Sequence, residues 1–340
     1  MSRRPFRLAA EGRPFLEIAS LGRSAPSGGR LSAAQIEQIR RTVRRTPEVM
    51  VKVTGGGTKA GAVAAHFAYI SRRGKLEIET DEGERTTGKD AQKTLLADWH
   101  LDLSAGQYRG PRDGRTDARA TRLVHNIVLS MPAPTPPEKV LAAARVFARE
   151  KFGAQHRYAM VLHTDQAHPH VHLVVKAEGD HGKRLYIDKS MLREWREDFA
   201  RMMREQGIAA NATPRVVRGR NKGKRHEGLF RARHHGDSCA FREKVMAMAR
   251  ELNRNGYFSE PAHAKLVGTR KAVVDNWMNI AERVDKQGEA VLAGDVRYFA
   301  KQLPPVRTDT ERLADRLAQH LTNSRKLRAR DPPDRDSPTR

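Results

Sequence analysis

HTDQAHPHVH, at residues 163–172, is the most informative stretch of this chain. It joins two short runs, residues 158–162 and 171–175, that have the length and the apolar content of strands. The short connection between the runs predicts an antiparallel hairpin. Because alternate side chains of a strand point to opposite faces, His170 and His172 share one face while Val171 packs on the other. His163 ends the first strand, and we expect it beside that pair.

Three imidazoles that converge from two neighbouring strands can hold one divalent metal and leave coordination positions open for a substrate. Asp165 lies two residues after His163, and we expect it to accept a ring N–H and fix the tautomer of that ligand. His168 lies in the connecting loop and has no role in this scheme. Two alternating histidines alone are more often ordinary surface or core residues. The third histidine, at hairpin spacing, is what favours a metal site.

The flanking sequence alternates between helix and strand patterns. Val63, Phe67 and Ile70 recur at helical spacing and predict a helix over residues 60–72 with one buried stripe. Strands are expected at residues 49–53 and 123–129, and a small hairpin at 76–88. Helices are expected at residues 90–103, at 135–152 with proline in the first turn, and at 191–206 behind an N-cap at Ser190. Helices mixed with strands around a hairpin predict an α+β fold with a central antiparallel sheet, rather than a parallel doubly wound sheet. Segments 238–254, 260–286 and 288–302 look helical and predict a further helical region.

The charge balance points to a polyanionic partner. Lys and Arg number 64 against 40 Asp and Glu, which gives a formal net charge of +24. Nucleic acid is the first candidate and an anionic membrane surface the second. No run approaches the roughly 18 apolar residues of a spanning helix, which argues against membrane insertion. Cys239 is the single cysteine, so an intramolecular disulfide is excluded and a reducing cytoplasm is expected.

Basic residues gather in segments that could contact phosphates. Residues 214–235 are rich in Arg, Lys and Gly without an apolar period, which predicts a loop or linker. The Gly-rich loop before the helix at residue 60 lacks the spacing of a nucleotide-binding P-loop, but its position at a helix N-terminus could cradle one phosphate. The residues expected to contact DNA are Lys59, Arg72, Arg73, Arg215, Arg218 and Arg220.

Tyr69 is the candidate nucleophile, because the only cysteine lies in a different segment. It falls on the helix at residues 60–72, off the apolar stripe, and Arg72 and Arg73 follow it. A phenol has a pKa of about 10 and attacks poorly as it stands. A nearby metal and arginines would favour the phenolate and the charge that develops on phosphorus. The alternative is a half-buried packing residue, which would be preferred without the histidines.

Two motifs together resemble a known family. HFAYISRRG at residues 66–74, followed by LHTDQAHPHVHLVV at 162–175, resembles the conjugative relaxases of plasmids. These are His-hydrophobe-His (HUH) endonucleases of the mobilisation type, akin to the T-DNA border nuclease. The segment LREWREDFARMMREQGIAANATPR, at residues 192–215, also resembles the part of the family that follows the metal strand. The resemblance covers residues 46–220, and the histidine string is its most specific part.

The resemblance implies a sheet of about five antiparallel strands, a nucleophilic tyrosine at Tyr69, and a metal held by His163, His170 and His172. It implies an enzyme that nicks one strand at an origin of transfer, stays joined to the 5′ end through phosphotyrosine, and later religates. Ligand type alone would suit Zn²⁺ or Mn²⁺, whereas the family implies Mg²⁺ or Mn²⁺. Single-stranded origin DNA, accessory relaxosome proteins, a type IV coupling protein and a bacterial cytoplasmic location follow from the same resemblance.

The expected domains are a basic, partly disordered N-terminal arm over residues 1–45 with one helix over 33–43, a relaxase domain over 46–220, a basic linker with helices over 221–310, and a disordered basic tail over 311–340. The arm is an expected addition, because many relaxases place the tyrosine close to their N-terminus. Two alternatives remain open at this point. A replication initiator of the HUH type would use the same chemistry at another origin, and a basic DNA-binding protein would use the histidines for a structural metal.

Overall fold

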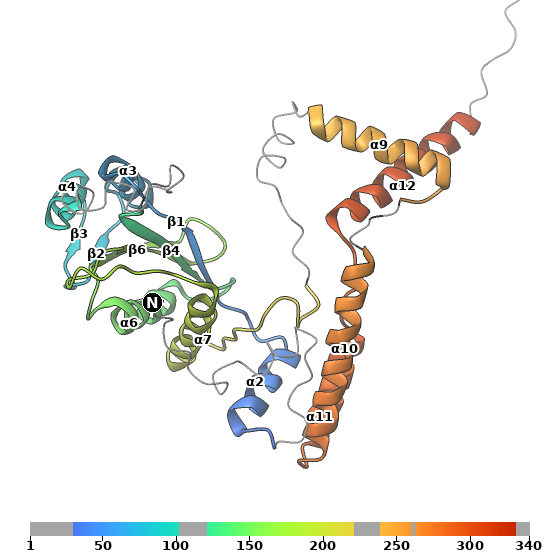
Figure 1. Cartoon of the computed structure of the whole chain (residues 1–340), viewed down its shortest axis with the longest axis horizontal. Coiled ribbons are helices and arrows are strands. Elements are labelled where there is room, and N and C mark those ends of the chain that lie inside the picture. Colours follow the sequence, from blue (N-terminus) through green and yellow to red (C-terminus); the bar gives the residue numbers. More distant parts are fainter. Residues whose placement is uncertain (1–29, 102–120, 221–238, 259, 261–262, 331–340) are drawn as a thin grey trace, which may run out of the picture. The chain divides into compact units, whose positions relative to one another are not determined.

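The computed structural model describes residues 30–101, 121–220, 239–258, 260 and 263–330 (Figure 1). The chain forms two units. The sheet unit comprises Arg44–Ala212, and the helical unit comprises Met1–Val43 with Thr213–Arg340. Within the described ranges, no helix is long and apolar enough to cross a membrane.

The sheet unit is an α+β structure built on one antiparallel sheet, as predicted. The strand order is β1-β4-β6-β5-β2-β3, so β6 lies between β4 and β5. The sheet has six strands where about five were expected, because a two-residue β3 extends one edge. The strands are β1 (Met50–Gly55), β2 (Ile78–Thr80), β3 (Arg85–Thr86), β4 (Val124–Ser130), β5 (Tyr158–His163) and β6 (His170–Lys176).

Helices cover both faces of this sheet. On one face, α6 (Pro137–Phe152) and α7 (Lys189–Glu205) pack over a core that includes Leu173 and Phe147. The Phe147 ring makes T-shaped contacts with the rings of Phe152, Trp195 and Phe199. Such aromatic contacts add to the apolar area that the core removes from water.

The other face carries α3 (Ala60–Ile70) and α4 (Lys89–Asp98). Val63, Phe67 and Ile70 are fully buried there against Val161 and Val174 of the sheet, which confirms the predicted apolar stripe. Because this stripe fixes the rotation of α3 about its axis, it also fixes the direction of Tyr69, which lies off the stripe.

The start of α7 differs from the expectation. Asp188, not Ser190, is the N-cap, and its carboxylate accepts the backbone N–H of Met191 at 2.8 Å. The Ser190 hydroxyl donates to the same carboxylate. A carboxylate at this position also suits the positive end of the helix dipole, which explains why it replaces the serine.

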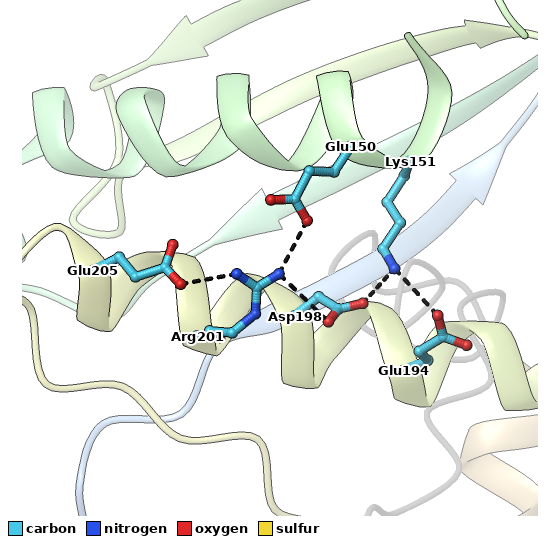
Figure 2. Close-up of polar contacts among 6 residues, drawn as sticks. All are labelled: Glu150, Lys151, Glu194, Asp198, Arg201 and Glu205. Atoms are coloured by element: carbon cyan, nitrogen blue, oxygen red, sulfur yellow. Dashed lines mark hydrogen bonds and ion pairs between the residues drawn. The ribbon is translucent and has the colours of Figure 1, made fainter. Parts of the chain in front are cut away.

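A set of charged side chains joins α6 to α7 (Figure 2). Lys151 Nζ lies 2.5 Å from a carboxylate oxygen of Asp198, and Arg201 Nη2 lies 3.0 Å from Glu150. The network is completed by Glu194 and Glu205. These side chains lie at the border of the packed interface, so they complement the apolar contacts between the two helices.

The helical unit contains α2 (Ala33–Val43), α9 (Cys239–Asn255), α10 (His263–Asp285), α11 (Ala290–Lys301) and α12 (Asp309–Arg330). Its core includes Trp277 of α10, Phe299 of α11 and Ile39 of α2. The helix expected at residues 33–43 of the N-terminal arm is therefore confirmed, while residues 1–29 lie outside the described residues.

Two further boundaries differ from those expected. Residues 213–220 belong to the helical unit, because Trp277 Nε1 donates to the Val217 carbonyl and Arg270 donates to the Gly219 carbonyl. Residues 309–330 form α12, which contacts α9, where a disordered tail was expected. Leu313, Leu317 and Leu321 recur at helical spacing and give the first half of this segment an apolar stripe. The remaining tail residues, 331–340, lie outside the described range.

The two kinds of contact between α6 and α7 should differ in their effect on stability. Phe147→Ala removes a fully buried ring and should lower the free energy of unfolding by about 3–5 kcal/mol. Arg201→Ala removes ion pairs of a side chain that is 43% exposed, and the cost should be below about 1 kcal/mol. Urea unfolding of both variants measures the difference. A larger loss for Arg201→Ala would show that the charges, and not the apolar core, hold these helices together.

Candidate metal centre and nucleophile

The pairing of β5 with β6 brings three histidines to one face of the sheet. His163 lies directly opposite His170, and His172 lies opposite Val161. The ring centroids are 5.1 Å apart for His163–His170, 4.5 Å for His163–His172 and 5.1 Å for His170–His172. One nitrogen of each ring lies within 4.8 Å of the others. The sequence prediction that these three imidazoles gather at one place is confirmed.

Hydrogen bonds to backbone carbonyls determine which nitrogen of two rings can act as a ligand. His163 Nε2 lies 2.6 Å from the Ile70 carbonyl oxygen, and His170 Nδ1 lies 3.0 Å from the His168 carbonyl oxygen. Because a carbonyl only accepts, each of these nitrogens carries the proton. His163 Nδ1 and His170 Nε2 therefore keep a lone pair, the form in which imidazole binds a metal.

Burial favours the neutral form of two of the three imidazoles. Burial, followed by the charges of His163 and His170, lowers the pKa of His172 to about 3. Burial is also the main cause that lowers the pKa of His163. Protonated imidazole cannot bind a cation, so a low pKa leaves the ligand nitrogens of His163 and His172 available near neutral pH. The side chains fit a divalent metal that accepts nitrogen ligands, such as Mn²⁺ or Zn²⁺.

Asp165 has a different partner from the one expected. Its nearer carboxylate oxygen lies 3.9 Å from His163 Nδ1, beyond hydrogen-bond distance. The carboxylate instead accepts a hydrogen bond from the Arg72 guanidinium, which lowers the pKa of Asp165. The proton on the His163 ring is directed by the Ile70 carbonyl. Asp165 therefore holds Arg72, and the backbone of α3 orients the ligand.

Arg72 links the histidines to Tyr69. Its Nη2 donates at 3.3 Å to the His163 Nδ1 lone pair, a contact that a bound metal would replace, and its guanidinium carbon lies 5.2 Å from the centroid of the Tyr69 ring. Arg72 and Arg73 have φ values of 52° and 58°. Residues other than glycine rarely adopt this left-handed conformation, and such strain collects at functional sites. Here it lets the chain turn back after α3, so that the Arg72 side chain returns over the site.

Tyr69 lies on the same side of the sheet as the histidines. Its side chain is 61% exposed, and its ring centroid is 6.5 Å from that of His172. His66, one helical turn earlier, has its ring centroid 6.4 Å from Tyr69 and 6.3 Å from His172. Sequence reasoning did not include His66 in the site, although its spacing from Tyr69 on the helix is the signal that would have found it.

The other residues expected to bind DNA lie outside this cluster. Lys59 and Arg73 are exposed, and Lys59 is at the N-cap of α3, the opposite end of the helix from Tyr69. Arg215, Arg218 and Arg220 are in the helical unit. The Arg218 guanidinium donates to the Thr213 carbonyl. Residues 221–235 of the same basic block lie outside the described residues.

The observed contacts predict that Asp165 matters little for metal binding. Asp165→Asn should change the Kd for Mn²⁺ by less than about threefold, because it is not within hydrogen-bond distance of His163. His170→Ala removes a direct ligand and should weaken binding by about 100-fold or more. Titration of Mn²⁺ followed by EPR measures both constants. A loss in Asp165→Asn as large as that in His170→Ala would mean that Asp165 orients a ligand after all.

Part of the sheet unit is similar to known relaxases. Residues 70–208 match the family model described as "Relaxase: MobA/VirD2-like, nuclease domain". The T-DNA border endonuclease VirD2 of Rhizobium radiobacter is 28% identical over 186 residues, which cover 51% of this chain and 43% of that protein. VirD2 of Rhizobium rhizogenes is 29% identical over 137 residues, which cover 38% of this chain and 30% of that protein. The matched part is therefore less than half the length of either relative.

Two solved structures are more distant. The MobM relaxase domain bound to plasmid origin-of-transfer DNA, in a Mn-bound crystal form, is 16% identical, with a TM-score of 0.34 over 54% of this chain and 98% of that chain. A structure titled "Molecular Basis of Vancomycin Resistance Transfer in Staphylococcus aureus" is 13% identical, with a TM-score of 0.32 over 49% and 98%. Structural similarity this low supports no conclusion about this chain. Residues 70–208 are thus similar to the nuclease domain of MobA/VirD2-like relaxases, and the histidine motif lies within this matched range.

Proposed function

We propose that this protein is a metal-dependent DNA relaxase that nicks one strand at an origin of transfer, with Tyr69 as the nucleophile. The observation that carries the proposal is the position of the Tyr69 phenol on the histidine face of the sheet, with its ring centroid 6.5 Å from that of His172. An attacking oxygen and the groups that bind the phosphate must surround one small volume, because reacting atoms have to approach within about 3–3.5 Å.

In the proposed reaction, the Tyr69 phenol loses its proton and attacks the scissile phosphorus. The bond from phosphorus to the 3′ oxygen breaks, the 5′ phosphate stays on Tyr69, and the leaving strand ends in a 3′-hydroxyl. When bound at His163, His170 and His172, a divalent cation would supply Lewis-acid polarisation of a phosphate oxygen. Reversal of the same transesterification religates the strand, because the phosphotyrosine bond conserves the energy of the phosphodiester.

Arg72 has two roles in this proposal. Its guanidinium lies 5.2 Å from the centre of the Tyr69 ring, a cation–π contact that orients the phenol at the site. The same charge favours the negative charge that develops on the phosphate oxygens. Asp165 acts through Arg72, because its hydrogen bond holds the guanidinium over the site. Asp165 is thus a positioning residue rather than a catalytic one.

Single-stranded DNA near the nick is the proposed substrate. Lys59, Arg72 and Arg73 belong to the sheet unit and would contact its phosphates, and the helical unit would contribute Arg215, Arg218 and Arg220. The T-DNA border endonucleases named among the relatives act on DNA, which supports a nucleic-acid substrate. Accessory relaxosome proteins, a type IV coupling protein and action in the bacterial cytoplasm complete the proposal on the strength of the family resemblance.

The test of Tyr69 is the formation of a covalent adduct. The wild-type protein, incubated with Mn²⁺ and a single-stranded oligonucleotide of the candidate origin labelled at its 3′ end, should give a protein–DNA band that survives denaturing detergent. Tyr69→Phe should give no such band and should still bind the oligonucleotide, because only the attacking oxygen is lost. Tyr186→Phe is the matched control, since Tyr186 is also exposed, at 78%, and should form the adduct normally. An adduct in Tyr69→Phe would reject the proposed nucleophile.

A lysine substitution separates the effect of the guanidinium geometry of Arg72 from the effect of its positive charge. Arg72→Lys keeps the positive charge but loses the planar fork that contacts Asp165 and His163 together. The rate of adduct formation should fall by about 100-fold, with a much smaller change in DNA affinity. Arg149→Lys, an exposed arginine on α6, is the control and should react at the wild-type rate. A wild-type rate in Arg72→Lys would show that the geometry of the guanidinium is not used.

A further inference from the structure

His168 has no role in the reaction described above, yet both its side chain and its backbone make specific contacts. Its Nδ1 accepts the backbone N–H of Ala133 at 3.1 Å. Its carbonyl oxygen lies 3.0 Å from His170 Nδ1 and accepts the proton of that ligand. His168 therefore connects the loop that follows β4 to one of the three histidines of the metal site.

The same two segments are joined at the neighbouring residue. The Ser130 hydroxyl donates to the Pro169 carbonyl at 3.2 Å, and the Met131 N–H donates to the same carbonyl at 3.3 Å. Pro169 has no N–H of its own, and it restricts the conformation of His168 before it. The contacts at Pro169 are accepted by a backbone carbonyl, whereas the contact at His168 is accepted by its side chain. A substitution of His168 can therefore remove this one hydrogen bond.

We infer that His168 is a positioning residue that orients His170 toward the metal. The Ala133 N–H fixes the His168 residue, and the fixed His168 carbonyl then holds the Nδ1–H of His170. An imidazole whose Nδ1–H has a fixed partner presents Nε2 in one direction, whereas a free ring can rotate about χ2. Hydrogen-bond partners of this kind raise metal affinity. An imidazole without such a partner loses rotational freedom when the metal binds, and this loss makes binding weaker. The inference rests on the metal part of the proposed function.

The structure assigns the role to one particular nitrogen, and two substitutions can test this. The Oδ1 of asparagine is attached to Cγ, as Nδ1 of histidine is, so His168→Asn can still accept the Ala133 N–H. The oxygen of glutamine is one bond further out and corresponds to Nε2, so His168→Gln should lose this contact. His168→Gln and His168→Ala should both raise the Kd for Mn²⁺ by about tenfold. His168→Asn should stay within about threefold of the wild type.

Two readouts are needed on the full chain, neither of which depends on DNA cleavage. EPR titration of Mn²⁺ gives the Kd, and the visible spectrum of the Co²⁺-loaded protein reports the geometry of the ligands. The Co²⁺ spectrum of His168→Asn should match the wild type, and that of His168→Gln should differ. His181→Ala is the matched control, because His181 is exposed in a different loop, and it should change neither readout.

His170→Ala separates failure of this inference from failure of the metal site. If His170→Ala loses Mn²⁺ and the His168 variants all bind like the wild type, the metal site stands and the role of His168 is rejected. If His170→Ala itself binds Mn²⁺ normally, the proposed metal site fails and the inference fails with it. Should His168→Ala not fold, equal Kd values for His168→Asn and His168→Gln would still overturn the inference.

Discussion

The register between β5 and β6 is the constraint on which the rest of the site depends. It pairs His163 with His170 and places His172 on the same face, at ring distances of 4.5–5.1 Å. A slip of one residue would turn His170 and His172 to the opposite face, which α6 and α7 cover. The valines and leucines that alternate with the histidines prevent this slip, because it would remove them from a core in which Val171 and Leu173 are fully buried. The same packing thus stabilises the sheet and gathers the imidazoles.

Helix α3 completes the site through both its buried stripe and its C-terminal end. The stripe seals one face of the sheet and leaves Tyr69 directed toward the histidines. At the C-terminal end, the Ile70 carbonyl accepts the proton of the His163 ring, as the last carbonyls of a helix have no partner within it. Arg72 then turns back over Tyr69 and is held by Asp165. Helix α3 therefore supplies the phenol and the orienting carbonyl, and the turn that follows it supplies the cation.

The sequence predicts the parts of this arrangement that follow from periodicity. Alternation along a strand places His170 and His172 on one face, and helical spacing separates Tyr69 from the buried stripe. Periodicity does not predict contacts that are made by the backbone or by loop residues. The conformation of the hairpin loop decides that Asp165 meets Arg72 rather than His163. Similarly, α12 was missed because the high charge of its sequence outweighed a narrow apolar stripe.

A crystal structure of the Mn²⁺-loaded protein, with an anomalous difference map at the manganese edge, tests the geometry most directly. We expect one strong peak bounded by His163 Nδ1, His170 Nε2 and the His172 ring, with the Tyr69 phenol on the same side of the sheet and the Arg72 guanidinium between the phenol and Asp165. A peak bound by other residues, or a Tyr69 side chain directed away from the three imidazoles, would contradict a metal-assisted attack by this tyrosine.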